Sequence, residues 1–299
     1  MNAKAIVVGF DGSTGAHAAL AWALAEARMR HAPVRLVYAA PTSVQLTPPF
    51  GGYALPDVDE RRETGRQTLA AGVAAAAISA PDVGVDTRLT DATPPVALLS
   101  NAADSEMVVV GSRGLGGFSE LLVGSTSVQL ATHASCPVVV IRPSEPPRPD
   151  LVPGAAGVVV GVDGSDTSNE ALGFAFEEAA MRGVGLTAVH AWQSAYFDSP
   201  TTEALPSGSV VADEFQASEM RVLNESIRIW TEKLPAVTLS RRVVHGDPVT
   251  TLVDASRSAE LLIVGSRGRD GFRSLLLGSV SHAMVHHAHC PVAVVRHAS

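Results

Sequence analysis

The sequence predicts two tandem α/β domains, each built on a parallel, doubly wound (Rossmann-like) sheet flanked by helices. Two observations carry this prediction. Short, continuously apolar runs such as Ile6-Val7-Val8 alternate with helix-compatible segments, as expected when strands are buried between two helix layers. The whole pattern then occurs twice: residues 6–13 match 158–165, and residues 133–138 match 287–292, at offsets of 152 and 154 positions.

Length and composition agree with two globular domains. The chain has 299 residues, of which 46% are hydrophobic and 17% charged, so it can form packed cores. A formal net charge of −8 argues against nucleic acid or an acidic membrane as a partner. No apolar run has the length of a membrane span, and the N-terminus leads straight into an apolar strand, so we expect a cytoplasmic protein without a signal peptide.

The elements of the first copy are predicted in chain order from local pattern. Apolar runs predict strands at residues 5–9, 33–39, 85–89, 106–110 and 137–141. Ser13 or Thr14 can cap a helix that ends near Arg30, and an alanine-rich helix follows at 59–80. Pro94 opens a helix to about residue 103, and the last helix spans about 125–133. In the second copy, residues 167–170 resemble a capping box.

Proline-rich and glycine-rich stretches mark the connections. Residues 143–150 contain four prolines and predict a semi-rigid linker, so we divide the chain into domain 1 at 1–143, a linker at 144–155 and domain 2 at 156–299. Residues 41–56 and 193–211 are long for structureless connections inside a domain, which makes them candidates for a lid or a partner site.

A glycine phrase recurs between a strand and a helix in each copy. Gly111-Ser112-Arg113-Gly114 is followed after nine residues by Gly124-Ser125, and the same spacing recurs from Gly265 through Gly268 to Gly278-Ser279. Glycine lets the backbone approach a phosphate closely, and a helix N-terminus offers free N–H groups to an anion. The phrase therefore predicts a phosphate site in each copy. The alternative is that these glycines only close tight turns.

An aspartate follows the first strand of each copy, at Asp11 and Asp163. An aspartate between a strand and a helix is an ordinary helix cap. Beside a phosphate it would be repulsive unless it met a ribose hydroxyl or a metal ion. Pattern alone leaves both roles open.

Three pieces occur twice in the same order: a strand ending in Gly-Phe-Asp-Gly-Ser or Gly-Val-Asp-Gly-Ser, the glycine phrase, and Cys-Pro-Val before the last strand. This combination resembles the universal stress protein family over nearly the whole chain, and in particular its ATP-binding branch. The resemblance implies a five-stranded sheet of order 3-2-1-4-5 in each copy, a homodimer, and nucleotide-dependent regulation in stress response or growth control. It implies ATP as the ligand, and Mg²⁺ bridging to phosphate is chemically compatible with it. The implied nucleotide-binding positions are Gly9, Asp11, Ala39, Gly111, Gly114, Gly124 and Ser125 in the first copy, and Gly161, Asp163, Ala191, Gly265, Gly268, Gly278 and Ser279 in the second.

The two copies differ around this expected site. The Gly-x-Pro pattern common in the family is kept at Gly246 but lost at Ala92. The second glycine phrase contains Arg269 and Arg273, where the first has Leu115 and Ser119. Two added cations favour a triphosphate, although both arginines could simply be solvated. We therefore predict that the second copy binds nucleotide at least as tightly as the first.

Two other functional classes stay open. One is an enzyme, either a slow ATP hydrolase or a self-phosphorylating protein that uses Ser125 or Ser279, but the sequence names no convincing base. The other is a purely structural interaction module whose sites are empty. No metal site is predicted, because the histidines and cysteine at 286–290 are adjacent on a helix end and do not converge.

Overall fold

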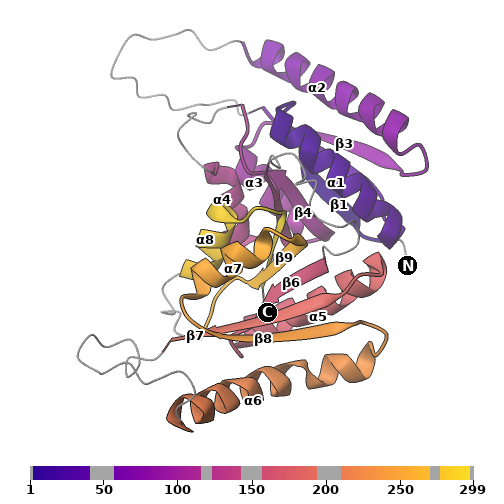
Figure 1. Ribbon diagram of the computed structural model, residues 1–299. Coiled ribbons are helices and arrows are strands. Elements are labelled where there is room, and N and C mark those ends of the chain that lie inside the picture. Colours follow the sequence, from indigo (N-terminus) through magenta and orange to yellow (C-terminus); the bar gives the residue numbers. More distant parts are fainter. Residues whose placement is uncertain are drawn as a thin grey trace, which may run out of the picture. The chain divides into compact units, whose positions relative to one another are not determined.

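The structure, a computed structural model, describes residues 3–40, 57–115, 123–142, 157–193, 210–269 and 277–296 (Figure 1). The predicted loop at 41–56, the linker at 144–155 and all but the ends of the loop at 193–211 lie outside the described residues. The chain divides into two compact units, Met1–Pro143 and Ser144–Ser299, which are described one at a time.

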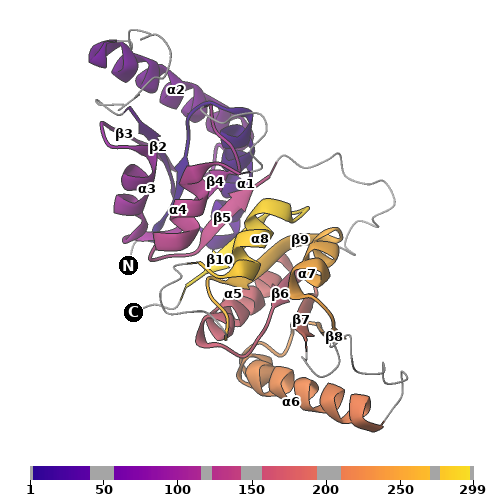
Figure 2. The same cartoon turned by 90° about the vertical axis from the view of Figure 1, so that its left-hand side faces the viewer.

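The first unit is a five-stranded parallel sheet with helices on both faces. Its strands pair in the order β3-β2-β1-β4-β5, as the resemblance implied. Helices α1 and α2 pack together on one face, and α3 and α4 on the other (Figure 2). The elements are β1 (Ala5–Gly9), α1 (Thr14–Arg30), β2 (Val34–Ala39), α2 (Val58–Ser79), β3 (Val85–Thr90), α3 (Pro94–Ala102), β4 (Ser105–Gly111), α4 (Ser125–His133) and β5 (Val138–Ile141).

The second unit repeats this arrangement with the strand order β8-β7-β6-β9-β10. Here α5 packs with α6, and α7 packs with α8 (Figure 1). The elements are β6 (Gly157–Gly161), α5 (Asp166–Arg182), β7 (Leu186–Trp192), α6 (Val210–Lys233), β8 (Leu239–His245), α7 (Pro248–Ser256), β9 (Ala259–Gly265), α8 (Ser279–His287) and β10 (Val292–Val295). Every predicted element of the first copy is present to within about two residues.

The central strands form the core of each unit. Ile6, Val7 and Val8 of β1 are at most 1% exposed, because helices cover both faces of the sheet. This explains why the strand sequence is continuously apolar and does not alternate. No helix within the described ranges is long and apolar enough to cross a membrane.

The first helix of each unit begins at a serine cap. The Ser13 hydroxyl accepts a hydrogen bond from the Ala16 N–H at 3.1 Å, as predicted. In the second unit the predicted capping box at 167–170 is wrong. Ser165 occupies the cap position that Ser13 holds in the first unit, and its hydroxyl accepts from the Ser168 N–H at 3.3 Å. The Thr167 hydroxyl instead donates to the carbonyl of Arg267, in the glycine phrase.

The start of α1 presses directly on the end of β4. A side-chain carbon added at Gly111 would lie 2.6 Å from the carbonyl carbon of Gly15, so only glycine allows this approach. The close packing brings the turn after β1 and the glycine phrase after β4 to the same edge of the sheet.

Candidate functional site: a pocket at the carboxyl ends of β1 and β4

The candidate site lies where the strand order of the first unit reverses. β1 pairs with β2 on one side and with β4 on the other. The connection after β1 leads to β2, and the connection after β4 leads to β5 at the other end of the sheet, so these two connections run in opposite directions. Such a switch point leaves a crevice beyond the carboxyl ends of the strands, where ligands bind in open α/β sheets.

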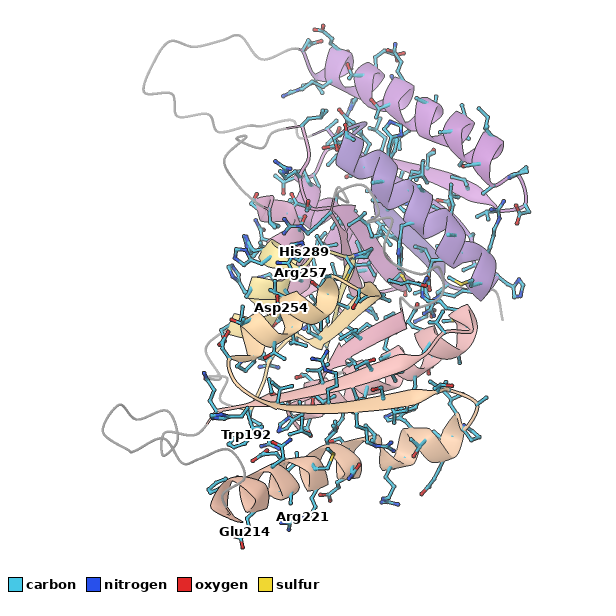
Figure 3. All side chains as sticks on the ribbon, viewed as in Figure 1. Trp192, Glu214, Arg221, Asp254, Arg257 and His289 are labelled. Atoms are coloured by element: carbon cyan, nitrogen blue, oxygen red, sulfur yellow. The ribbon has the colours of Figure 1, made fainter. Side chains whose placement is uncertain are left out.

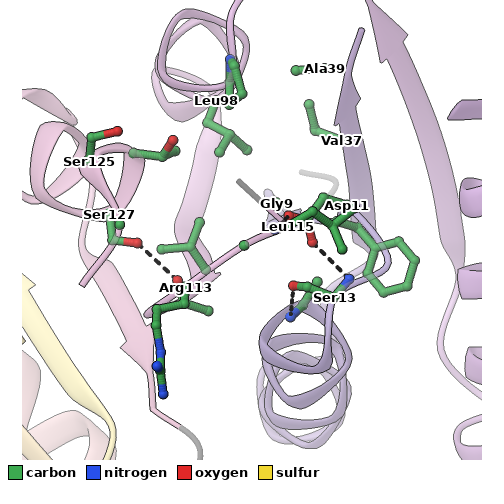
Figure 4. Close-up of a pocket in the computed structure, with 18 of the residues that line it drawn as sticks. Gly9, Asp11, Ser13, Val37, Ala39, Leu98, Arg113, Leu115, Ser125 and Ser127 are labelled. Atoms are coloured by element: carbon green, nitrogen blue, oxygen red, sulfur yellow. Dashed lines mark hydrogen bonds between the residues drawn. The ribbon is translucent and has the colours of Figure 1, made fainter. Parts of the chain in front are cut away.

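A pocket of about 450 Å³ occupies this crevice (Figure 4). The structure brings all seven nucleotide-binding positions predicted for the first copy to its wall: Gly9, Asp11, Ala39, Gly111, Gly114, Gly124 and Ser125. They come from β1, β2, β4, α4 and the adjoining turns, so residues more than 100 positions apart in the sequence share one cavity.

The pocket has an apolar side and a polar side. Val37 and Ala39 of β2 and Leu98 of α3 form an apolar wall, while the glycine phrase and the first turn of α4 supply backbone groups. Sequence reasoning named Ala39 but missed Val37 and Leu98. The alternation of a strand could have revealed Val37, which lies two residues before Ala39 and so faces the same side. Nothing local identifies Leu98, which belongs to a helix that packs near β1 only in the folded chain.

Asp11 connects the turn after β1 to the glycine phrase. Its Oδ1 accepts the Ser13 N–H at 2.9 Å, and its Oδ2 accepts the Leu115 N–H at 3.0 Å. Asp11 therefore does not act as the helix cap, which is Ser13; it holds the glycine loop against the sheet. Burial, and then the negative charge of Asp11, raise the pKa of the nearby Tyr38 hydroxyl above its usual value.

Gly114 fits this arrangement because it has no side chain. A carbon added at Gly114 would collide with Oδ2 of Asp11, the oxygen that accepts the Leu115 N–H. From the sequence, a glycine was expected here because the backbone would approach a phosphate. The structure adds a second reason, which is that the backbone at Gly114 also lies against the Asp11 carboxylate.

The first turn of α4 forms part of the pocket wall. Gly124 is the N-cap and makes no side-chain capping bond, so no side chain already satisfies the first-turn amides. Two hydrogen bonds fix the helix to the end of β4: the Gly124 N–H donates to the Ser112 carbonyl at 2.6 Å, and the Ser127 hydroxyl donates to the Gly111 carbonyl at 2.9 Å. The helix start is therefore rigidly placed and able to face an anion.

The second unit reproduces these contacts. Asp163 accepts the Ser165 N–H through Oδ1 at 2.9 Å and the Arg269 N–H through Oδ2 at 2.9 Å. A carbon added at Gly268 would lie 2.5 Å from Oδ2 of Asp163. Gly278 is the uncapped N-cap of α8, and its N–H donates to the Ser266 carbonyl at 2.8 Å. Of the other predicted positions, Gly161 ends β6, Gly265 ends β9, Ser279 begins α8, and Ala191 lies one residue before the end of β7.

The differences predicted between the copies are visible in part. The Arg269 guanidinium lies beside Gly164, with Nη2 2.6 Å from where a side-chain carbon of that glycine would be. It therefore folds back over the β6–α5 turn. Leu115, its counterpart in the first copy, is 72% exposed. Arg273 and Ser119 lie outside the described residues. Asp247 caps α7 by accepting the Thr250 N–H at 2.7 Å, whereas Thr93 makes no such bond at the start of α3.

Among the described residues, no three histidine, cysteine, aspartate or glutamate side chains are grouped so that they could hold a metal ion. Both cysteines, Cys136 and Cys290, are buried and free.

Comparison with known proteins identifies the family. The family model described as "Universal stress protein family" matches residues 2–142 and again 157–296. A universal stress protein of Mycobacterium tuberculosis is 40% identical over 296 residues, which cover 97% of this chain and 96% of that protein. A universal stress protein of Mycolicibacterium smegmatis is 34% identical over 295 residues, with the same coverage of both chains. The crystal structure of a universal stress protein from Archaeoglobus fulgidus shares the fold, with a TM-score of 0.67, 20% identity, and coverage of 99% of this chain and 97% of that one.

Two matches of one family model, together with relatives that align along nearly the full length, account for the internal repeat. The chain belongs to the universal stress protein family and carries two copies of the family domain in tandem.

Proposed function

We propose that each copy binds one adenine nucleotide, ATP, and that the protein acts as a nucleotide-dependent regulator in stress response or growth control. One observation carries the proposal: the seven positions expected to touch nucleotide in the first copy all line a single pocket at the switch point of the sheet. Its volume of about 450 Å³ lies within the range of roughly 300–1,000 Å³ that is usual for small-molecule sites.

The chemistry of the walls supports a nucleotide with the base on one side and phosphates on the other. Val37, Ala39 and Leu98 would take the apolar base. The amides at the start of α4 and the hydroxyl of Ser125 would take the phosphates. A helix N-terminus contributes only about 0.3–2 kcal/mol, and micromolar affinity needs about 8 kcal/mol. Base burial and several amide contacts must therefore act together.

Mg²⁺ would enter this site with the phosphates. Asp11 is the one carboxylate among the described residues of the pocket wall, and both of its oxygens already accept backbone N–H groups. A direct metal contact would have to compete with these bonds, so Asp11 fits a ribose hydroxyl or an outer-sphere water better.

The same geometry favours binding over hydrolysis. A hydrolase needs a group that positions water and cations that offset charge in the transition state. Both oxygens of Asp11 already accept backbone N–H groups, from Ser13 and Leu115, so this carboxylate serves as a structural acceptor. Ser125 does line the pocket, so self-phosphorylation is kept as an outcome of the test.

The test is the nucleotide content of the purified protein. The chain is isolated without added nucleotide and denatured, and the supernatant is analysed by anion exchange with mass detection. We expect about two ATP per chain, about one in Gly114→Asp and in Gly268→Asp, and no loss in the control Gly84→Asp, whose new side chain enters open space. ADP in place of ATP would favour hydrolysis, and a phosphorylated Ser125 would favour self-phosphorylation. No bound nucleotide and no thermal shift with added ATP would refute the proposal.

We also propose, from the family resemblance, that the protein is a cytoplasmic homodimer. Light scattering on the purified chain tests the dimer directly, and fractionation of cells tests the location.

A further inference from the structure

Two arginines follow the carboxyl ends of two neighbouring strands, β9 and β10, at one corner of the second unit. β9 and β10 run parallel, with Gly265 opposite Val295, and the Ser266 N–H donates to the Val295 carbonyl at 2.7 Å one residue further on. Arg267 follows Ser266, and Arg296 follows Val295, so the sheet itself brings the two side chains to the same corner.

Neither guanidinium has a negatively charged partner within the described ranges. Both residues are half-buried, and neither forms an ion pair there. Nη1 of Arg296 is fully buried and meets no hydrogen-bond acceptor among the described residues. A buried donor of this kind is costly unless an anion or a carbonyl satisfies it.

The two side chains also repel each other. Burial, and then the positive charge of Arg267, lower the pKa of Arg296 below its usual value. A pair of like charges without a counter-charge destabilises the fold that holds it, and a bound anion would remove both the repulsion and the unsatisfied donor.

A third positive feature adjoins the pair. The N-terminus of α8 packs against the backbone of Arg267, since a side-chain carbon at Gly278 would lie 3.3 Å from the Arg267 Cα. Gly278 makes no side-chain capping bond. The helix start proposed to face the nucleotide phosphates is therefore also close to the backbone of Arg267, and its dipole adds partial positive charge there.

The first unit repeats the corner with Arg113 and Arg142. Gly111 lies opposite Ile141, and burial followed by the charge of Arg113 lowers the pKa of Arg142. Figure 4 shows the Arg113 side chain pointing away from Asp11 and Ser125. Arg113 is among the residues that line the nucleotide pocket, so the arginine corner adjoins that pocket, but its guanidinium extends away from the pocket residues Asp11 and Ser125.

We propose that the guanidinium groups of Arg267 and Arg296 form a second anion site in the second unit, next to the positions proposed for nucleotide, which binds the phosphate group of inorganic phosphate or of a phosphomonoester. Two guanidinium forks match the charge and the oxygens of a phosphate dianion better than those of a single carboxylate. The proposal does not depend on nucleotide binding.

The test is calorimetric titration of the full chain with inorganic phosphate, and separately with glycerol phosphate, in chloride buffer of constant ionic strength. Arg267→Gln and Arg296→Gln should each bind about one phosphate fewer per chain than the wild type, or bind it at least tenfold more weakly. Arg257→Gln is the charge-matched control, because Arg257 is exposed and pairs with Asp254 on α7 (Figure 3). Gly268→Ala, which disturbs the glycine loop, should keep the site. If only glycerol phosphate binds, the natural ligand is a phosphomonoester.

Thermal melting in chloride buffer without phosphate is an independent test of the proposal. Arg296→Gln should melt at the wild-type temperature or above it, because it removes a repelled, unsatisfied cation. Phosphate should raise the melting temperature of the wild type more than that of this variant. Three results would overturn the proposal: unchanged phosphate binding in both arginine variants, loss of binding in Gly268→Ala alone, or a melting temperature for Arg296→Gln several degrees below wild type.

Discussion

The replacement of one glycine in each glycine phrase by alanine tests how the loop is held. In Gly268→Ala the new carbon would lie 2.5 Å from Oδ2 of Asp163, so the carboxylate or the loop must move. That movement breaks the 2.9 Å bond between Oδ2 and the Arg269 N–H. A hydrogen bond to a charged group contributes about 1.5–3 kcal/mol. If binding needs the closed loop, this corresponds to about a 10- to 150-fold loss in ATP affinity at this copy.

The assay is calorimetric titration with ATP, followed by urea unfolding of the same samples. Gly114→Ala should weaken the first copy in the same way, and the double variant should lose both high-affinity sites. Gly84→Ala is the matched control, because a carbon there meets nothing within 4 Å. The reasoning fails if Gly268→Ala and Gly114→Ala bind ATP as tightly as Gly84→Ala, or if they lose binding only because the whole domain has unfolded.

Three further outcomes follow from the contacts. Asp163→Ala removes the acceptor of two backbone amides, so ATP affinity of the second copy should fall at least tenfold in the same titration; unchanged affinity would contradict the role given to this carboxylate. His190 is 3% exposed and forms hydrogen bonds with the Val162 carbonyl at 2.7 Å and with Glu219 at 2.8 Å. His190→Phe should therefore lower the free energy of unfolding, measured in urea, by about 1–3 kcal/mol. A variant as stable as the wild type would argue against these bonds. Burial raises the pKa of the Cys290 thiol to about 12, which keeps it protonated in the folded state. Its stabilising contribution is therefore complete below the unfolded pKa of about 8.5 and declines above it, and iodoacetamide at pH 8 should label it only at the rate of unfolding; rapid labelling would refute its burial.

The fold could be predicted from sequence because its determinants are local and repeated. Continuous apolar runs such as Val158-Val159-Val160 identify buried parallel strands without any knowledge of their neighbours. The error at residues 167–170 shows the limit of this reasoning. Two serines and a threonine near the start of α5 all fit a helix cap, and the choice of Ser165 depends on where the preceding strand ends.

The glycine phrases were also evident in the sequence, but their closest contacts were not. Spacing alone indicated that Gly114 and Gly268 need to be small. The side chains that approach them, Asp11 and Asp163, are more than 100 positions away and reach them only when β1 and β4, or β6 and β9, become neighbours.

By itself, the sequence determined the repeat, the α/β class and the glycines at strand ends, since each depends on residue type and short-range spacing. The tertiary structure decided which groups meet at those ends. It placed Leu98 in the pocket wall, made Asp11 the anchor of the glycine loop, and set Arg267 beside Arg296 at one corner. The physical reason is that strand order is a long-range property: hydrogen bonding between strands far apart in the chain selects the neighbours of each residue, and local pattern carries no record of that selection.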